Sequence, residues 1–196
     1  MPRRAALNVL EDVVEARERT KQLHGRLERQ AGWLRGQSGA LEAALKNAPL
    51  ETSLGVLVRT ATDALGGDAR AAFYVGNGEA APLRHVIGMP DEYAVELAVS
   101  QVEPGSPIIA VREDPRWESW RCLAERFGYR GAWNFPITTS SGRFAGALVI
   151  YLAQLRNPDL REMELAELLT NTASLIISRH EESEVRRRAE EPRSEN

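Results

Sequence analysis

Aromatic and polar side chains that could bind a small molecule occur in several separate parts of the chain. Aromatic rings line ligand cavities, in which a few polar groups fix the orientation of the ligand. The candidate ligand-binding residues are Tyr74, Arg112, Trp117, Trp120, Arg121, Trp133, Asn134 and Phe135. The arginines and the asparagine would orient an anionic or polar ligand. The alternative is that the rings only fill a hydrophobic core, since an aromatic stripe at helical spacing is more often packing.

The residue types that most often perform catalysis have no productive spacing. Cys122 is the only cysteine, so it can neither form an internal disulfide nor run a redox cycle that needs a second thiol. His24 and His85 lie far from each other and from Cys122, which is not metal-ligand spacing. The glycines within residues 76–78 precede an expected strand, so we interpret them as a turn rather than a phosphate loop. The sequence therefore predicts no catalytic residue, no metal and no cofactor.

Residues 130–153 are the most strongly patterned stretch and predict a β-hairpin. Ser-Ser-Gly at residues 140–142 supplies the turn. Trp133 and Phe135 share one face of the first strand, whereas the second strand, at residues 144–152, is apolar on both faces. A strand of that kind must be covered on both sides, so we expect the hairpin inside a sheet with helices or long loops above and below it.

The remaining pattern predicts an α+β domain that begins after Asn-Ala-Pro at residues 47–49. Helices are expected at residues 50–65, 90–100 and 115–127, and from residue 157 or 159 onward. Further strands are expected at residues 70–75, 82–89 and 107–111. The order of these elements favours a mainly antiparallel sheet, with the helices near both ends of the domain covering one face.

Residues 3–30 are charged, contain no proline and repeat apolar residues at heptad spacing, which predicts a long coiled-coil-like helix. A narrow apolar stripe of this kind needs a partner, and a parallel homodimer is the simplest one. The predicted dimer-interface residues, on this helix and on the last one, are Val9, Val13, Leu23, Leu27, Leu34, Leu168 and Leu175. Gly32, Gly36 and Gly39 each cost about 1 kcal/mol relative to alanine in a helix interior, so the helix either breaks there or continues.

Three segments follow from these patterns. We predict a helical linker at residues 1–47, a globular domain at residues 48–182, and a helix end with a disordered tail at residues 183–196.

Composition excludes several classes of function. The 196-residue chain is 43% hydrophobic, has a formal net charge of -3 and gives no reason to expect nucleic acid as a partner. The longest apolar run, residues 144–153, is far shorter than the ~20 residues that span a bilayer, and no signal peptide precedes it. We therefore expect a cytoplasmic protein without membrane insertion.

About residues 50–182 resemble the GAF domains of bacterial two-component sensor proteins. The resemblance rests on DPRW at residues 114–117, GYRGAWNFPI at residues 128–137, a Ser-Gly turn, GALVIY at residues 146–151 and a closing helix. The preceding ALNVLEDVVEARERT, residues 6–20, resembles the helical linkers that join sensory domains in such proteins.

This resemblance implies a six-stranded antiparallel sheet, a helical face used for dimerisation, and an opposite face where some relatives hold a cyclic nucleotide, a bilin or another small molecule. Residues 92–106 form a shorter stretch than many relatives have there, which argues against a large closed pocket. In bilin-binding relatives a histidine usually follows the chromophore-attaching cysteine, whereas Leu123 follows Cys122 here. We therefore expect no covalently attached bilin.

His180 precedes acidic residues, as the phosphoacceptor histidines of kinases often do, but no Gly-rich nucleotide-binding motif follows it. We interpret it as a solvated histidine and expect no kinase catalytic domain in this chain, which could be a piece of a sensor histidine kinase. The leading hypothesis is a non-catalytic sensory or regulatory module of a bacterial signal-transduction protein. It would dimerise through its terminal helices and connect to upstream and downstream signalling domains. Whether it also binds a small molecule is left open by the sequence. The alternative is a ligand-free structural dimerisation or adaptor domain.

Overall fold

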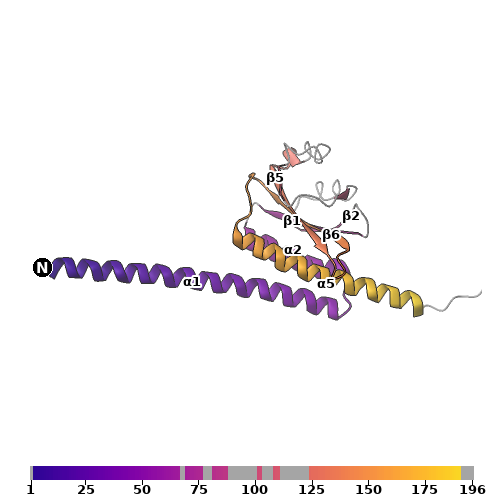
Figure 1. The fold of residues 1–196 in the computed structure, drawn as a ribbon, viewed down its shortest axis with the longest axis horizontal. Coiled ribbons are helices and arrows are strands. Elements are labelled where there is room, and N and C mark those ends of the chain that lie inside the picture. The colour runs from indigo at the N-terminus through magenta and orange to yellow at the C-terminus, as the bar shows by residue number, and fades with distance from the viewer. Residues whose placement is uncertain are drawn as a thin grey trace, which may run out of the picture. The chain divides into compact units, whose positions relative to one another are not determined.

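The computed structural model describes residues 2–66, 69–76, 81–87, 101–102, 108–110 and 124–190 (Figure 1). The chain divides into two compact units, Met1–Arg35 and Gly36–Asn196. The first unit is helical, and the second combines a sheet with helices. The domain limits expected at residues 47 and 182 stay predictions.

Helix α1 (Pro2–Leu45) runs without a break through Gly32, Gly36 and Gly39. Of the two alternatives that the glycines left open, the continuous helix is the one observed. Good helix formers dominate its sequence, and pairs four residues apart, such as Arg19 and Glu15 at 2.6 Å, add small contributions. The helix ends where Asn47 adopts a left-handed backbone with φ of 56°. No helix in the described part of the chain is both long and apolar enough to cross a membrane.

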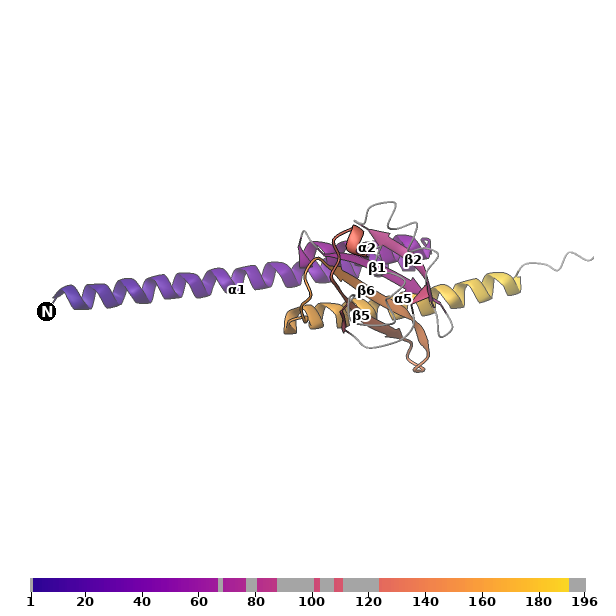
Figure 2. The same ribbon diagram turned by 90° about the horizontal axis from the view of Figure 1, so that it is seen from above.

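Helices α2 (Leu50–Leu65) and α5 (Leu160–Glu190) lie side by side on one face of the sheet (Figures 1 and 2). α2 has the bounds that the sequence predicts, and α5 begins directly after Asp159, one of its two expected starting points. Both helices turn an apolar stripe toward the sheet, because burial of those side chains is what stabilises an amphipathic helix. Their fully buried apolar residues include Leu54, Leu57, Val58, Ala61, Leu165, Leu169, Ala173 and Ile177.

The sheet is antiparallel and orders its strands β3-β2-β1-β6-β5-β4. The strands are β1 (Arg70–Val75), β2 (Ala81–Ile87), β3 (Gln101–Val102), β4 (Ile108–Ala110), β5 (Gly131–Thr138) and β6 (Phe144–Leu152). The predicted α+β fold, in which helices pack on an antiparallel sheet, is confirmed. The expected helix at residues 90–100 lies outside the described residues. Of the one expected at residues 115–127, only residues 124–127 are described; residues 124–126 are helical and residue 127 belongs to a turn.

Strand β6 is flanked by β1 and β5 and is buried on both faces from Ala145 to Leu152, as its sequence predicts. Gly146 lies very close to the backbone of β1. Its φ is 150°, and a Cβ atom there would lie 2.0 Å from the carbonyl oxygen of Tyr74. Only glycine fits this position, because any side chain would collide with the backbone of the neighbouring strand.

The last turns of α1 approach α2 closely at one glycine. A Cβ atom on Gly36 would lie 2.0 Å from Oγ1 and 2.9 Å from Cβ of Thr60. A Cβ atom on Gly39 would lie 3.6 Å from the nearest atom, Cγ1 of Val56, which is an ordinary van der Waals contact. The approach of the two helices therefore requires glycine at position 36 and tolerates alanine at position 39.

We predict that Gly36→Ala lowers the free energy of unfolding by about 1–3 kcal/mol, because α1 and α2 must move apart to admit the methyl group. Gly39→Ala is the matched control. It should leave stability unchanged or raise it by up to about 1 kcal/mol, because alanine is the better helix former. Urea denaturation of both variants measures the difference, and equal responses would contradict the close approach.

Candidate functional site

Strand register divides the side chains of the sheet between two faces. Residues directly opposite each other in neighbouring strands share a face, as do alternate residues along a strand. One row consists of Trp133, Ile150 and Ala71, and the next row on that face consists of Phe135, Leu148 and Phe73. This is the face that α2 and α5 cover, since the indole of Trp133 contacts the segment that leads into α5.

The opposite face of the sheet carries buried polar groups. Asn134 shares a row there with Val149 and Ala72, while Tyr74 and Tyr151 occupy neighbouring rows on the same face. Of the predicted ligand-binding residues, the structure thus brings Tyr74 and Asn134 to one face and places Trp133 and Phe135 on the other. The remaining candidates, like Cys122, lie outside the described residues. These candidates are Arg112, Trp117, Trp120 and Arg121.

Trp133 and Phe135 are core residues on the helix-covered face. Their rings meet edge to face with centroids 6.5 Å apart and an interplanar angle of 76°. The Nε1–H of Trp133 donates a hydrogen bond of 2.8 Å to the backbone carbonyl of Arg156. Because the indole is buried and its polar atom is satisfied, packing between sheet and helices accounts for both rings.

Two tyrosines join their hydroxyl groups on the opposite face. The oxygen atoms of Tyr74 and Tyr151 are 2.6 Å apart, and both side chains are completely buried. Burial raises the pKa of Tyr74, so its phenol stays neutral. The ring of Tyr129 packs at a tilt against that of Tyr151, with centroids 5.7 Å apart, and burial also raises its pKa.

Asn134 is the most unusual polar residue of this face. It is 2% exposed, and its Oδ1 atom accepts no hydrogen bond from any described residue. A buried acceptor without a donor costs about 1–3 kcal/mol, so proteins seldom keep one without a reason. Oδ1 of Asn134 is thus a buried acceptor that lacks a donor within the described part of the chain.

The sequence held a signal for Tyr151, which was not among the candidates. Tyr151 follows Ala147 and Val149 at alternate positions of β6, so it belongs to the same face as these residues. Its pairing with Tyr74 depends on the register between β1 and β6, which local patterns do not specify.

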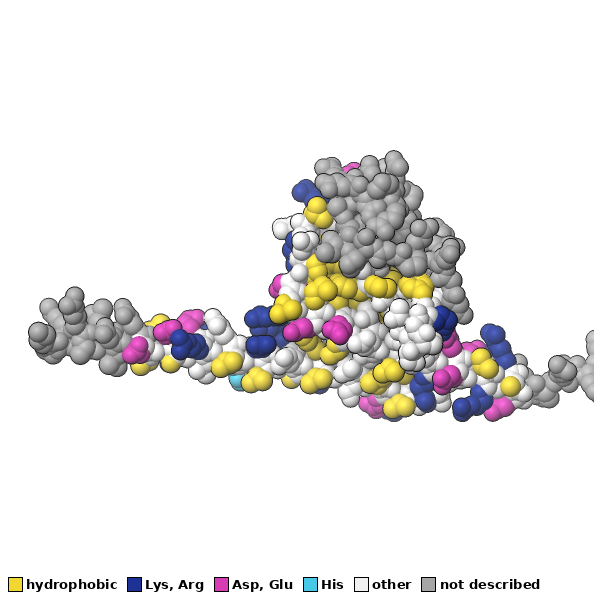
Figure 3. All heavy atoms as spheres, viewed as in Figure 1, with side chains coloured by type: hydrophobic (Ala, Val, Ile, Leu, Met, Phe, Trp, Pro, Cys, Tyr) yellow, Lys and Arg dark blue, Asp and Glu magenta, His cyan; other side chains and the backbone are white. Residues whose placement is uncertain are grey.

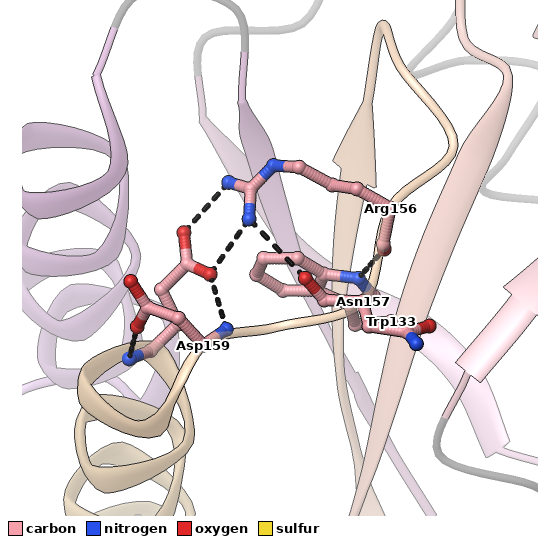
Figure 4. Close-up of polar contacts among 5 residues, drawn as sticks. Trp133, Arg156, Asn157 and Asp159 are labelled. Carbon is pink, nitrogen blue, oxygen red and sulfur yellow. Dashed lines mark hydrogen bonds and ion pairs between the residues drawn. The ribbon is translucent and has the colours of Figure 1, made fainter.

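A second cluster fastens the sheet to the start of α5 (Figure 4). The guanidinium of Arg156 lies over the ring of Trp133, 4.7 Å from its centroid, and binds Glu162 through two hydrogen bonds of 2.6 and 2.7 Å. Its side chain is 42% exposed and that of Glu162 15%. The hydrogen bonds to Glu162 raise the pKa of Arg156. One side chain thus links the sheet core to the first turn of α5, and we call this cluster the Arg156 latch.

The same glutamate also caps the helix. Asp159 and Glu162 exchange backbone-to-side-chain hydrogen bonds, each 2.8 Å long, in a capping box. The carboxylates lie at the positive end of the helix dipole, which favours them further. Glu162 therefore serves the cap and the latch together, so the helix start and the sheet core are mechanically connected. The sequence predicted that the helix begins at residue 157 or 159, but it offered no sign of the role of Arg156.

Among the described residues, no cluster of His, Cys, Asp or Glu has the arrangement of a metal site.

Several solved structures have a similar fold. A domain of a protein assigned as a two-component sensor histidine kinase from Sinorhizobium meliloti 1021 has a TM-score of 0.59 and 17% identity, over 71% of this chain and 97% of that one. The GAF domain of a phosphoenolpyruvate-protein phosphotransferase from Acinetobacter has a TM-score of 0.54 and 16% identity, over 78% of this chain and 97% of that one. The chain has the fold of a GAF domain, and the expected resemblance is confirmed.

Sequence comparison supports the same class over a shorter stretch. A methyl sulfide methyltransferase-associated sensor from Methanosarcina acetivorans is 35% identical over 78 residues, which is 39% of this chain and 8% of that sensor. The chain thus spans only a small part of the length of this relative. No protein-family model matches the chain.

We predict that Arg156→Met lowers the free energy of unfolding by about 1–2 kcal/mol, because it removes a bidentate ion pair and a cation–π contact while it keeps an apolar stem. Arg161→Met removes the same charge from an exposed position of α5 and should change stability by less than about 0.5 kcal/mol. Thermal and urea unfolding compare the two variants. If Arg156→Met lowers the free energy of unfolding no more than Arg161→Met does, the latch does not hold α5.

Proposed function

We propose that this chain is a non-catalytic sensory or regulatory module of a signal-transduction protein. The observation that carries this proposal is the Arg156 latch, which joins the core of the sheet to a helix that extends beyond the sheet (Figure 1). A helix anchored in this way would shift when the sheet core rearranges. Two similar proteins support the assignment to signalling: the sensor from Methanosarcina acetivorans and the Sinorhizobium meliloti protein assigned as a sensor histidine kinase, to which the similar domain belongs.

The proposed ligand face is the side of the sheet that α2 and α5 do not cover. Asn134 Oδ1 would accept a hydrogen bond from the ligand, beside the hydroxyl pair of Tyr74 and Tyr151. The proposed class of ligand is a small molecule with at least one hydrogen-bond donor and an apolar or aromatic body. The phycoerythrobilin-bound GAF domain of a cyanobacterial phytochrome has the same fold, with a TM-score of 0.52 and 14% identity.

The proposed mode of assembly is a homodimer through the terminal helices. Hydrophobic side chains recur along the exposed surface of α1 (Figure 3), and those of Val13, Leu23, Leu27 and Leu34 are all more than half exposed. On α5, Leu168 is half-buried and Leu175 is 63% exposed. The side chain of Val9 lies outside the described residues. A second copy would remove these stripes from water, and further signalling domains could then attach to paired helices.

A ligand-free dimerisation or adaptor domain is the second candidate. One observation favours it, because atoms of the chain itself already bury β6 on both faces. In that case Asn134 would meet a group of this chain or a water molecule, and the sheet would serve only as a rigid support for the helices.

We predict that the wild-type chain is a dimer at tens of micromolar and that Leu175→Arg raises the dimer dissociation constant at least about tenfold, because the charge must be desolvated in both copies. Leu155→Arg is the matched control, since Leu155 is 52% exposed but lies outside the helices. Sedimentation equilibrium measures the dimer dissociation constants of the wild type and of both variants. A wild-type monomer, or equal weakening by the two variants, would refute dimerisation through α5.

Native mass spectrometry of the freshly purified chain distinguishes the two functions. A sensor with a retained ligand should show an added small mass that disappears in Asn134→Leu but persists in Asn171→Leu, which changes an exposed asparagine of α5. A spectrum without added mass, together with a more stable Asn134→Leu variant, would favour the adaptor. The stability gain is expected because leucine removes an unpaired buried acceptor.

A further inference from the structure

A cavity of about 460 Å³ lies where the end of α1 and the start of α2 meet α5. Ala44, Asn47 and the first turn of α2 line one side, and the C-terminal half of α5 lines the other. Its volume is within the range of small-molecule sites. The cavity belongs to the helical layer, so it is separate from the proposed ligand face of the sheet.

The start of α2 is a partly unsatisfied helix N-terminus. Pro49 precedes the helix, and no side chain caps it. The backbone N–H groups of Thr52 and Ser53 donate to the carbonyl of Pro49, at 3.0 and 3.4 Å, whereas those of Leu50 and Glu51 have no backbone partner in the described part of the chain. The first turn of a 16-residue helix such as α2 carries a partial positive charge, and its free N–H groups favour anions.

Ser53 provides independent evidence for a ligand. It lines the cavity and is 1% exposed, and its hydroxyl has no hydrogen-bond partner in the described part of the chain. Thr60 and Thr62 of the same helix behave differently, since their hydroxyls donate to carbonyls one turn back at 2.8 and 3.2 Å. A buried hydroxyl that makes no such bond needs a partner from elsewhere.

The wall formed by α5 is predominantly basic. Its charged and titratable residues at the cavity are Arg179, His180, Glu184, Arg186, Arg187 and Glu190. Arg187 pairs with Glu184 at 2.9 Å, which lowers the pKa of that glutamate. Arg179 donates its Nε–H to the carbonyl of Ala44 at 3.2 Å, so its guanidinium is held across the gap between α5 and α1. The arginines outnumber the carboxylates, so the cavity suits an anion.

We propose that this cavity binds a small phosphorylated molecule. Its phosphate would lie between the first turn of α2 and the guanidinium of Arg179 and accept a hydrogen bond from the hydroxyl of Ser53. Guanidinium groups, backbone N–H groups and a hydroxyl are the donors that recognise phosphate. The cavity is larger than a phosphate ion, which leaves room for the organic part of the molecule. The site does not depend on a ligand at the sheet face.

Isothermal titration calorimetry of the full chain tests the site, with inorganic phosphate and glycerol 3-phosphate as probes at constant ionic strength. We expect saturable binding of both probes at one site per chain, with the phosphomonoester binding more tightly. Arg179→Gln should weaken binding about tenfold or more, as expected for loss of a charge-assisted hydrogen bond. Ser53→Ala should weaken it about three- to tenfold while the melting temperature in phosphate-free buffer stays the same or rises.

Arg161→Gln is the charge-matched control at the other end of α5 and should bind both probes as the wild type does. Circular dichroism confirms that each variant is folded. Three results would overturn the site: no saturable binding up to about 10 mM of either probe, equal weakening by Arg161→Gln, or unchanged binding in both Arg179→Gln and Ser53→Ala. Equal weakening would show a general charge effect, and unchanged binding would place the anion elsewhere.

Discussion

The burial of β6 on both faces is the constraint on which the rest of this structure depends. A two-sided apolar strand leaves no face for water, so helices must cover one side and other segments of the chain the other. α2 and α5 cover the first side and turn their apolar stripes toward Ile150 and Leu148. Gly146 belongs to the same constraint, since β1 could not pair so closely with a strand that carried a side chain there. The helical layer therefore forms because the central strand needs a cover.

The Arg156 latch connects the packed core of the sheet to the first turn of α5. A salt bridge at this exposure would contribute little by itself. Here its arginine also stacks on Trp133, and its glutamate also completes the capping box of α5. Three weak interactions thus share two side chains, so their contributions to stability are expected to be coupled. The position of the first turn of α5 is consequently set by a residue of the sheet core, which propensity alone would not achieve.

Much of the fold could be predicted because its signals are local. The helix at residues 50–65 has a 3.6-residue period and a terminal glycine, and the hairpin has a two-residue period and a Ser-Gly turn. Helix α1 is a case in which local signals were not sufficient, because they left open whether the helix breaks at its glycines. Gly36 lowers helix propensity, yet the helix continues, because that glycine lets α1 approach Thr60. Tertiary packing outweighs the propensity cost at this position.

The candidate site was harder to predict for the same physical reason. Alternation along β5 already separates Trp133 from Asn134, but only the pairing of β1 with β6 decides which of them shares a face with Tyr74. That register depends on contacts between residues more than 70 positions apart, such as the hydroxyl pair of Tyr74 and Tyr151. Arg156 lies in an irregular segment without periodicity, so no pattern could assign its partners. Long-range register and loop geometry are thus the information that a single sequence lacks.

Helix α5 connects the two candidate sites through physical contacts. Its first turn is held by the Arg156 latch to the β5 strand that also carries Asn134, and its C-terminal half lines the cavity beside Ser53. A molecule at the sheet face would act on the start of α5 through Trp133, whereas an anion in the cavity would act on its later turns through Arg179. Since a helix transmits displacement along its axis, both events would change the same exposed stripe around Leu175. Two ligands could then influence the proposed dimer interface without touching each other, and their binding free energies would be coupled only through the position of this helix.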